Sequence, residues 1–200
     1  MLKVSHVKKS FKKLAVLKDI SLETQAGELV HISGVNGCGK STLFKIIVSL
    51  LKADSGEIHT DKDDYLGALI ENPGFIEYET AWDNLTFLGH FNHRFQPEKT
   101  RDLLKAFDLD PDNPQSVGNY SVGMRQKLGI TQAVMEDQNI ILLDEPTRGI
   151  DKEGVDQLVN LTKDLRSENK TVIVASHDEI PGLVYDRRLR MKDGILLAEE

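Results

Sequence analysis

Residues 29–47 read LVHISGVNGCGKSTLFKII: a short apolar run, a glycine-rich loop and a second apolar run. The run over residues 29–33 is typical of a buried strand, and the run that begins at Lys40 is typical of a helix that continues to about Leu51. The loop between them, residues 34–41, matches the pattern G-x-x-x-x-G-K-[ST]. A strand, a glycine loop and a helix in this order predict a site that binds phosphate groups.

The residue types of this loop suit an anion. Glycines let backbone N–H groups curl around a phosphate without Cβ clashes, and the positive N-terminal end of the following helix faces the same anion. We expect Lys40 to hold the β- and γ-phosphates of ATP and Ser41 to bind Mg²⁺. The other residues expected to contact the nucleotide here are Gly34, Asn36, Gly37, Cys38, Gly39 and Thr42. A glycine turn that only caps a helix is the alternative, and the strand–loop–helix order favours nucleotide binding.

Apolar runs elsewhere predict a sheet around this loop. The strand candidates are Tyr65–Ile70, Ile140–Leu143 and Thr171–Ala175. Continuous β-branched and apolar runs are typical of buried parallel strands, and Lys152–Ser167 reads as an amphipathic helix between two of them. Near the N-terminus, Leu2–Val7 and Val16–Glu23 suit a small antiparallel β-element, and the last strands end near Ala198. Strands that alternate with helices predict an α/β fold of the P-loop NTPase type with a mainly parallel sheet.

One long segment has a different pattern. From Thr80 to about Met135 the apolar spacing is helical, apart from a polar break at residues 108–115 that contains two prolines. This segment predicts a helical subdomain inserted into the α/β core. We therefore expect a single domain over residues 1–200, with a nucleotide-binding core (1–71 and 137–200) and a helical subdomain (72–136).

The strand candidate at residues 140–143 is followed by two carboxylates, Asp144 and Glu145. The carboxyl ends of parallel strands meet at the edge of the sheet where the phosphate loop also lies. We expect Asp144 to anchor Mg²⁺ through water and Glu145 to polarise the attacking water. Strands often end in solvated carboxylates, so it is the pairing with the phosphate loop that favours a metal site.

The composition limits the possible partners. The chain has 200 residues, a formal net charge of −7 and one cysteine. The negative charge argues against binding of nucleic acid through a broad positive field, and the single cysteine suits a reducing cytosol. A membrane span needs about 20 consecutive apolar residues, whereas the longest apolar stretch, Leu43–Leu51, is short and contains Lys45. We expect a cytosolic globular chain without a membrane span.

Four further motifs resemble those of ABC ATPases. Residues 120–126, YSVGMRQ, resemble the signature motif that is usually written LSGGQ, and its distance from the acidic strand is similar to the family's. Residues 147–151, TRGID, resemble the loop that follows the acidic strand. Residues 175–178, ASHD, resemble the segment that carries the switch histidine, and Phe11 stands where the family places an aromatic residue under adenine. In this order the motifs cover nearly the whole chain.

The resemblance implies how these residues act. Ser121 and Gly123 would contact the γ-phosphate of ATP bound to a second subunit, so that two chains enclose two ATP molecules head to tail. Ser121 would also cap the helix that it begins. His177 would bond to the γ-phosphate and hold the catalytic water, with Glu145 and Lys40 as the other catalytic residues.

Some positions leave alternatives open. Phe11 would stack on adenine, or it could lie in the core. The family usually carries glutamine where this chain has Glu71, whose carboxylate could still bind Mg²⁺ or water but adds negative charge near phosphate. Four apolar residues in the segment after it could form a groove for a membrane partner's coupling helix, or pack inside the insertion: Phe75, Ile76, Tyr78 and Trp82.

The sequence around Glu71 and the YSVGM signature resemble the bacitracin-resistance and lantibiotic-immunity subgroup. This resemblance implies the ATP-hydrolysing subunit of an ABC transporter, which works as a homodimer or heterodimer of ATPase subunits. It would drive export of a peptide, antibiotic or drug through a separate transmembrane permease subunit, on the cytoplasmic face of the membrane. A soluble ABC ATPase that acts in cofactor assembly stays open as the alternative.

Overall fold

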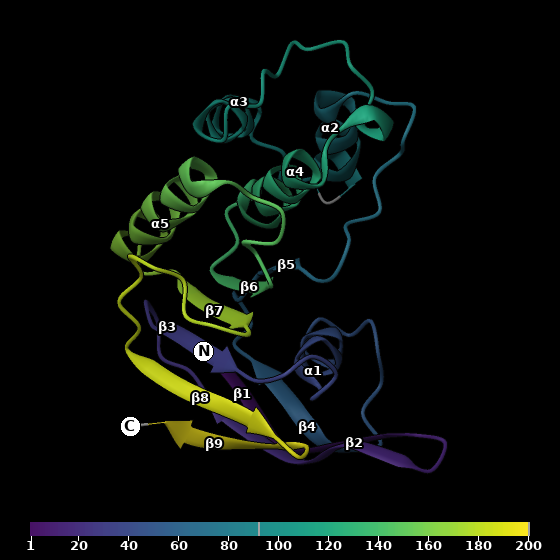
Figure 1. Cartoon of the computed structure of the whole chain (residues 1–200), viewed down its shortest axis with the longest axis vertical. Helices are drawn as coiled ribbons and strands as arrows, with labels where there is room; N and C mark the ends of the chain where they lie inside the picture. The colour runs from purple at the N-terminus through teal and green to yellow at the C-terminus, as the bar shows by residue number, and fades with distance from the viewer. Residues whose placement is uncertain (92, 200) are drawn as a thin grey trace.

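The computed structural model describes residues 1–91 and 93–199, and in this part of the chain nine strands form one sheet. The strands are β1 (Leu2–Phe11), β2 (Leu14–Glu23), β3 (Leu29–Ser33), β4 (Ser55–Thr60), β5 (Leu66–Leu69), β6 (Ile140–Asp144), β7 (Thr171–Ser176), β8 (Arg187–Lys192) and β9 (Ile195–Glu199). The helices are α1 (Lys40–Ile47), α2 (Ala81–Phe91), α3 (Pro97–Ala106), α4 (Val122–Val134) and α5 (Lys152–Ser167), with a 3₁₀ turn at Val117–Asn119. Figure 1 shows their arrangement.

The sheet has a parallel part and an antiparallel part. Its order is β4-β1-β2-β9-β8-β3-β7-β6-β5, and β8, β3, β7, β6 and β5 pair in parallel. The strands β4, β1 and β2 pair antiparallel, as do β8 and β9. The predicted α/β fold with a mainly parallel sheet and an N-terminal antiparallel element is confirmed.

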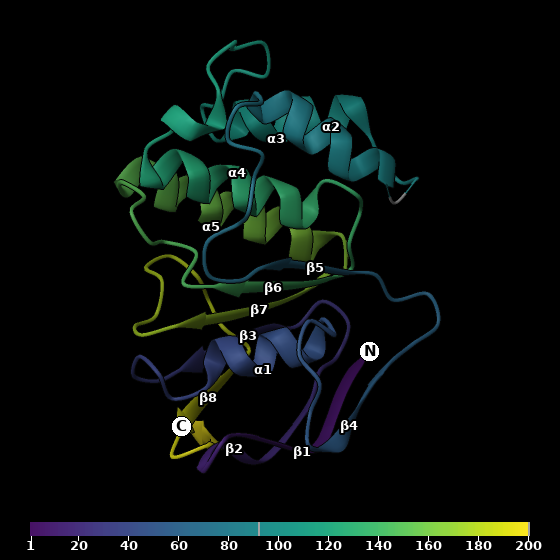
Figure 2. The same ribbon diagram turned by 90° about the vertical axis from the view of Figure 1, so that its right-hand side faces the viewer.

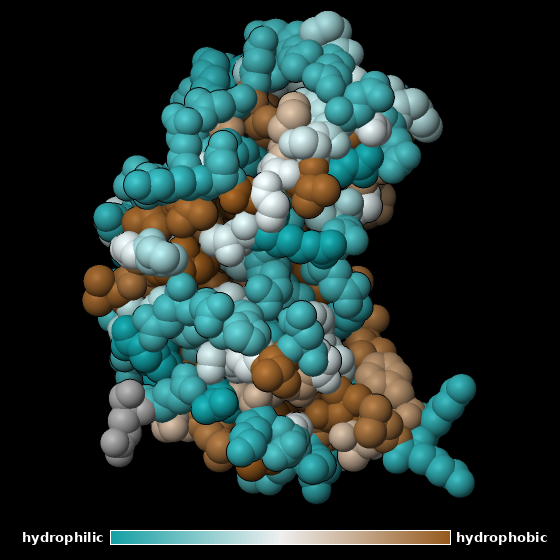
Figure 3. Space-filling model, viewed as in Figure 1, coloured by the Kyte–Doolittle hydropathy of each residue, from teal (hydrophilic) through white to brown (hydrophobic). Residues whose placement is uncertain are grey.

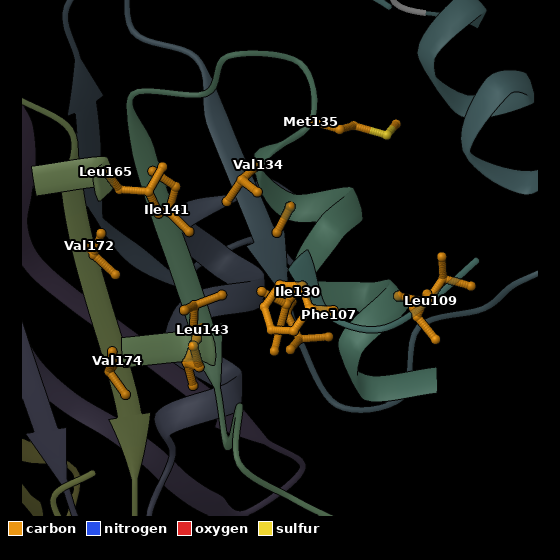
Figure 4. Close-up of a cluster of buried hydrophobic side chains, with 14 of the residues drawn as sticks. Phe107, Leu109, Ile130, Val134, Met135, Ile141, Leu143, Leu165, Val172 and Val174 are labelled. Carbon is orange, nitrogen blue, oxygen red and sulfur yellow. The ribbon is translucent and has the colours of Figure 1, made fainter. Parts of the chain in front are cut away.

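Two apolar cores cover opposite faces of the parallel strands. Along β6 the side chains alternate, since Ile141 and Leu143 join one cluster while Ile140 and Leu142 join the other. The first cluster contains residues of α4 and α5, and Figure 4 shows Ile130 and other residues of this cluster near β6 and β7. The second cluster contains the apolar face of α1. Burial on both faces explains why these strands read as continuous apolar runs.

At one edge of the molecule, the carboxyl ends of parallel strands and the N-terminal ends of several helices lie together. In Figure 2 the carboxyl ends of β6 and β7 and the N-terminal ends of α1, α4 and α5 all lie on the left-hand side. The helices α2, α3 and α4 gather at the far end of the molecule from β1 and β4. Helix N-termini carry partial positive charge, so this edge presents several such ends in one direction.

Three expectations about element boundaries need correction. The helix that begins at Lys40 ends at Ile47 and not at Leu51, because Ser49 takes a left-handed backbone conformation with φ of 61°. The helical segment is broken at residues 93–96 as well as at the expected polar break, and Pro97 begins α3. No strand was expected around Gly56, where β4 begins and pairs with β1.

Gly56 explains why β4 was missed. A Cβ at this position would lie 2.5 Å from the carbonyl oxygen of His6, and φ of Gly56 is 90°. The glycine therefore serves the close approach of two strands at a register shift between Ser5 and Lys8. Sequence alone reads such a glycine as a turn.

None of the helices in the described ranges is long and apolar enough to span a membrane.

Candidate functional site

The glycine loop between β3 and α1 has the geometry of an anion cradle. Gly37 and Gly39 have φ of 80° and 116°, and Gly39 is the N-cap of α1. A Cβ on Gly39 would lie 2.8 Å from the side chain of Leu17, and one on Gly34 would lie 2.6 Å from the carbonyl oxygen of Met191. Both positions therefore require glycine, and α1 begins with its N–H groups directed into the loop.

Lys40 is held inside this loop. The residue is 6% exposed, and its Nζ donates a hydrogen bond to the carbonyl oxygen of Gly34 at 2.5 Å. The same Nζ lies 3.6 Å from Oε1 of Glu145. A buried ammonium group that already contacts the loop and a carboxylate is placed to receive phosphate oxygens with little reorganisation.

Asp144 lies at the carboxyl end of β6, beside the loop. It is 4% exposed, and its burial raises the pKa of the carboxyl group, although a hydrogen bond with Ser41 and the charge of Lys40 oppose the shift. Among the described residues, Oδ1 of Asp144 and Oε1 of Glu145 are buried without a hydrogen-bond partner. Hydroxyl and carboxylate oxygens are the ligands that Mg²⁺ takes in nucleotide sites, so these residues fit a magnesium ion.

Glu145 is held in a strained backbone conformation by two neighbours. Its φ is 47°, its N–H donates to the carbonyl oxygen of Ala175 at 2.7 Å, and its own carbonyl oxygen accepts from Nε2 of Gln126 at 2.9 Å. Non-glycine residues in the left-handed region cluster at functional sites. Gln126 closes the signature motif, but its contact with the acidic strand could not be inferred from the sequence.

A pocket of about 530 Å³ joins the predicted phosphate and metal residues. Its lining residues are Asn36, Ser41, Glu71, Asp144, Glu145, Thr147, Arg148 and His177. The site therefore draws on four separate segments of the chain. Thr147 and Arg148 were not among the predicted site residues, although their motif was recognised, and Arg148 adds a cation that donates to Oδ1 of Asn72 at 3.3 Å.

His177 and Glu71 lie at the rim of this pocket. The side chain of His177 is 61% exposed, and its Nδ1 lies 3.1 Å from Oδ2 of Asp178, which leaves Nε2 for another partner. The side chain of Glu71 is 56% exposed and forms an ion pair with Nζ of Lys45 at 2.6 Å. Lys45 thus offsets the negative charge that Glu71 brings near the phosphate loop.

The signature residues lie outside the phosphate pocket. Ser121 is the N-cap of α4 and accepts a hydrogen bond from the N–H of Met124 at 3.1 Å. A Cβ on Gly123 would lie 2.4 Å from the carbonyl oxygen of Gly149. With Asp151, these residues help to line a separate hollow of about 160 Å³. Within one chain, the signature and the phosphate loop are therefore two distinct sites on the same edge of the molecule (Figure 2).

Phe11 lies at the surface. It ends β1, is 46% exposed and has Nζ of Lys9 at 5.6 Å from its ring centroid, so its placement in the core is excluded. Exposed Leu14 lies across the same turn, and Figure 3 shows apolar residues gathered in this part of the molecule. A pocket of about 510 Å³ runs from Leu14 and Val16 to the phosphate loop, without Phe11 in its lining.

The four apolar residues that follow Glu71 have different environments. Phe75 is buried in the core cluster, so packing inside the protein is the correct interpretation for this residue, whereas Trp82 is only partly buried against the cluster. Tyr78 is 81% exposed. Tyr78 and the half-buried Ile76 and Trp82 therefore remain candidates for contact with a partner.

The ABC transporter family model matches residues 17–148. An uncharacterized ABC transporter ATP-binding protein, YdbJ of Bacillus subtilis, is 34% identical over 92% of this chain, and the match spans 64% of that protein. The lantibiotic transport ATP-binding protein SrtF of Streptococcus pyogenes is 31% identical over 88% of this chain and 80% of its own length. The chain thus spans less than two thirds of the first of these relatives.

Solved structures agree with this assignment. The dimeric structure of the bacterial ABC transporter cassette MJ0796 is 29% identical, with a TM-score of 0.89 over 100% of this chain and 98% of that one. A post-hydrolysis state of the same cassette, bound to ADP and Pi, has a TM-score of 0.86 at 27% identity over the same shares of both chains. With these likenesses and the motifs in place, the chain belongs to the ABC transporter family, as an ATP-binding cassette.

Proposed function

We propose that this chain is the motor subunit of an ABC transporter, which binds MgATP at the interface of a head-to-tail dimer and hydrolyses it. One observation carries the proposal: the phosphate pocket and the signature end of α4 share one edge of the molecule but line separate hollows. A second chain related by a twofold axis would place the N-terminal end of its α4 at the phosphate pocket of the first chain. The same symmetry would place the N-terminal end of the first chain's α4 at the pocket of the second. The dimeric form of the similar cassette supports this arrangement.

In this proposal the residues of one chain hold the nucleotide. The N–H groups of the loop and Lys40 would bind the phosphates, and Ser41 and Asp144 would hold Mg²⁺, which would supply positive charge to offset that of the phosphates. Glu145 polarises the attacking water from its fixed backbone position. Ser121 and Gly123 of the other chain would donate N–H groups from the N-terminal end of α4 to the γ-phosphate.

His177 completes this set in the proposal. Asp178 contacts its Nδ1, and because a carboxylate only accepts, Nδ1 carries a proton. Nε2 would then accept a hydrogen bond from the attacking water when the ring is neutral, or donate to the γ-phosphate when both ring nitrogens carry a proton. Phe11 would stack on adenine from the exposed end of β1. Glu71 would bind Mg²⁺ or water at the rim, with Lys45 moderating its charge.

The proposed partner is a separate transmembrane permease, with the ATPase dimer on its cytoplasmic face. The core, residues 1–71 and 137–200, would hold ATP, and residues 72–136 would carry the signature and contact the permease. Likeness to a lantibiotic transport protein supports export of a peptide or antibiotic as the task. Exposed Tyr78, in the segment that joins the two parts, is a candidate contact.

The test is affinity capture of the Glu145→Gln variant with MgATP from gently solubilised native membranes. The substitution should slow hydrolysis and hold the closed dimer. A polytopic membrane protein that co-purifies in stoichiometric amount, and only with MgATP-competent protein, would support the proposal. A soluble partner set, with the chain absent from membranes, would instead point to an ATPase of cofactor assembly.

A further inference from the structure

A buried histidine links the phosphate-loop strand to the loop that carries His177. His31 lies on β3 and is 1% exposed, and its Nε2 is 2.8 Å from Oγ of Ser176 at the end of β7. Ser176 is itself 3% exposed, and its Oγ donates a hydrogen bond to the carbonyl oxygen of Asp178 at 2.6 Å. The serine thus closes a tight turn around the residue between them, His177.

The proton positions in this chain of bonds follow from its chemistry. A hydroxyl group has one proton and a carbonyl oxygen can only accept, so the proton of Ser176 is committed to Asp178. Nε2 of His31 must therefore donate to Ser176. Nδ1 of His31 is buried without a partner among the described residues, and burial lowers the pKa of the ring. His31 is a neutral imidazole with its proton on Nε2, and each donor in the series strengthens the next bond.

The ring of His31 also supports the far end of the same loop. It stacks on Tyr185 with centroids 4.8 Å apart and an angle of 29° between the planes. The hydroxyl oxygen of Tyr185 accepts a hydrogen bond from the N–H of Ile180 at 3.3 Å. The segment between β7 and β8 is thus attached to His31 at its start, through Ser176, and near its end, through Tyr185.

We propose that His31 is a positioning residue, which fixes the backbone turn at His177 so that the exposed imidazole stays aimed at the nucleotide. The inference rests on the proposed role of His177 at the γ-phosphate. In this proposal β3 has two roles. It leads into the phosphate loop, and through the hydrogen bond from His31 to Ser176 it fixes the geometry of the loop after the neighbouring strand β7, which carries His177. Loss of this hydrogen bond should therefore lower kcat and leave the affinity for ATP unchanged.

Two substitutions separate the hydrogen bond from the packing. His31→Phe keeps an aromatic ring against Tyr185 and removes the donor, whereas His31→Gln keeps an amide donor and removes the ring. We expect His31→Phe to lower kcat about tenfold while the Kd for MgATP stays within about twofold, and His31→Gln to retain most of the parent kcat. Equal losses in the two variants, or a His31→Phe variant with parental kcat, would overturn the proposal.

Ser176→Ala tests the same hydrogen bond from the serine side. Because it makes the side chain smaller, it cannot overpack the core, so the test remains possible even if His31→Phe does not fold. The substitution should lower kcat at least as much as His31→Phe, and the double variant should be no slower than Ser176→Ala alone. Additive losses would count against a shared path. Glu179→Gln, which breaks the exposed pair of this loop with Arg188 at 2.6 Å, is the matched control and should leave kcat within about twofold.

His177→Ala separates this inference from the proposed function. If His177→Ala keeps parental kcat, the role of His177 itself fails and the inference fails with it. If His177→Ala abolishes turnover but Ser176→Ala and His31→Phe do not reduce it, only the positioning role of His31 is wrong. Loss of kcat in all three, with His31→Gln active, supports both.

Discussion

The N-terminal ends of α1 and α4 are two candidate anion sites on one edge of the molecule, and they differ in how complete they are. The end of α1 is surrounded by a glycine loop, a buried lysine and two carboxylates that have free buried oxygens. The end of α4 has Ser121 as its cap and lines a small hollow that is formed mostly by neighbouring loops. The first site is therefore the more complete of the two.

In the proposed dimer, the difference between the two ends means that each chain contributes half of each catalytic site. The carboxylates beside α1 favour a bound cation, because a buried acidic oxygen without a hydrogen-bond partner is costly. The end of α4 offers N–H groups, but Lys127 in the lining of its hollow is only half-buried and the two aspartates there, Asp108 and Asp151, are exposed. It suits the outer face of a phosphate that another subunit already binds. Four substitutions test this division of labour, and they follow in order of expected effect.

Glu145→Gln should have the largest effect, on chemistry at the α1 end. Loss of the carboxylate that polarises water should lower kcat about 10³-fold, with the Kd for MgATP little changed, because the amide keeps the size of the side chain. Steady-state phosphate release and nucleotide titration measure the two quantities. The matched control is Glu168→Gln, which removes an exposed carboxylate that pairs with Lys170 at 2.8 Å outside the pocket and should keep kcat within about twofold. An equal loss in both variants would contradict the assignment of the base.

Lys40→Ala should act on binding at the same end. Its Nζ lies inside the loop at 2.5 Å from the oxygen of Gly34, so its loss removes a desolvated cation from the phosphates. We expect the Kd for MgATP to rise about 100-fold, measured by calorimetry. Lys45→Ala, on the same helix but paired with Glu71 at the rim, should change the Kd by less than about threefold. Similar losses in the two would mean that general positive charge, and not the loop geometry, binds the nucleotide.

Much of the α1 end could be predicted from the sequence, because its chemistry is local. The strand, the glycine loop and the helix are contiguous, and the acidic pair directly follows a buried strand, so spacing alone placed them. Residues whose contribution depends on tertiary contacts were missed. Arg148 enters the pocket, and Gln126 holds the carbonyl oxygen of Glu145, only because distant segments meet there.

The antiparallel region was harder to predict for a related reason. A Gly56 with positive φ resembles a turn, and only its contact with β1 shows that it belongs to a strand. His31 read as one more residue of a buried strand, since nothing in the sequence indicates that Ser176 lies beside it. Periodicity identifies which residues are buried, whereas the partner of a buried polar group depends on strand order.

Ser121→Ala should have a moderate effect, confined to the α4 end. It removes an N-cap, which lowers stability by about 1 kcal/mol, and in the proposed dimer it also removes a γ-phosphate contact, so kcat should fall about tenfold. The affinity of the isolated chain for ATP should not change. Thr80→Ala is a matched control, because its hydroxyl accepts from the N–H of Asp83 at the start of α2 at 3.1 Å. It should lower stability alike and leave kcat unchanged; loss of kcat in both would indicate a folding defect only.

Asp144→Asn should have the smallest effect, on the stability of the nucleotide-free chain. Burial raises the pKa of Asp144 in the folded state, so above that pKa the buried carboxylate lowers stability, and protonation relieves this as the pH falls through the raised value. The Tm of the variant should be about 2–4 °C above that of the parent at neutral pH, and this difference in Tm should narrow in acid. Addition of MgATP should no longer raise the Tm of the variant. Asp151→Asn keeps the N-cap of α5 and should leave Tm unchanged. A lower Tm for Asp144→Asn would mean that neighbouring groups already stabilise the buried carboxylate without Mg²⁺. The α1 end would then carry no greater cost of unpaired buried charge than the α4 end.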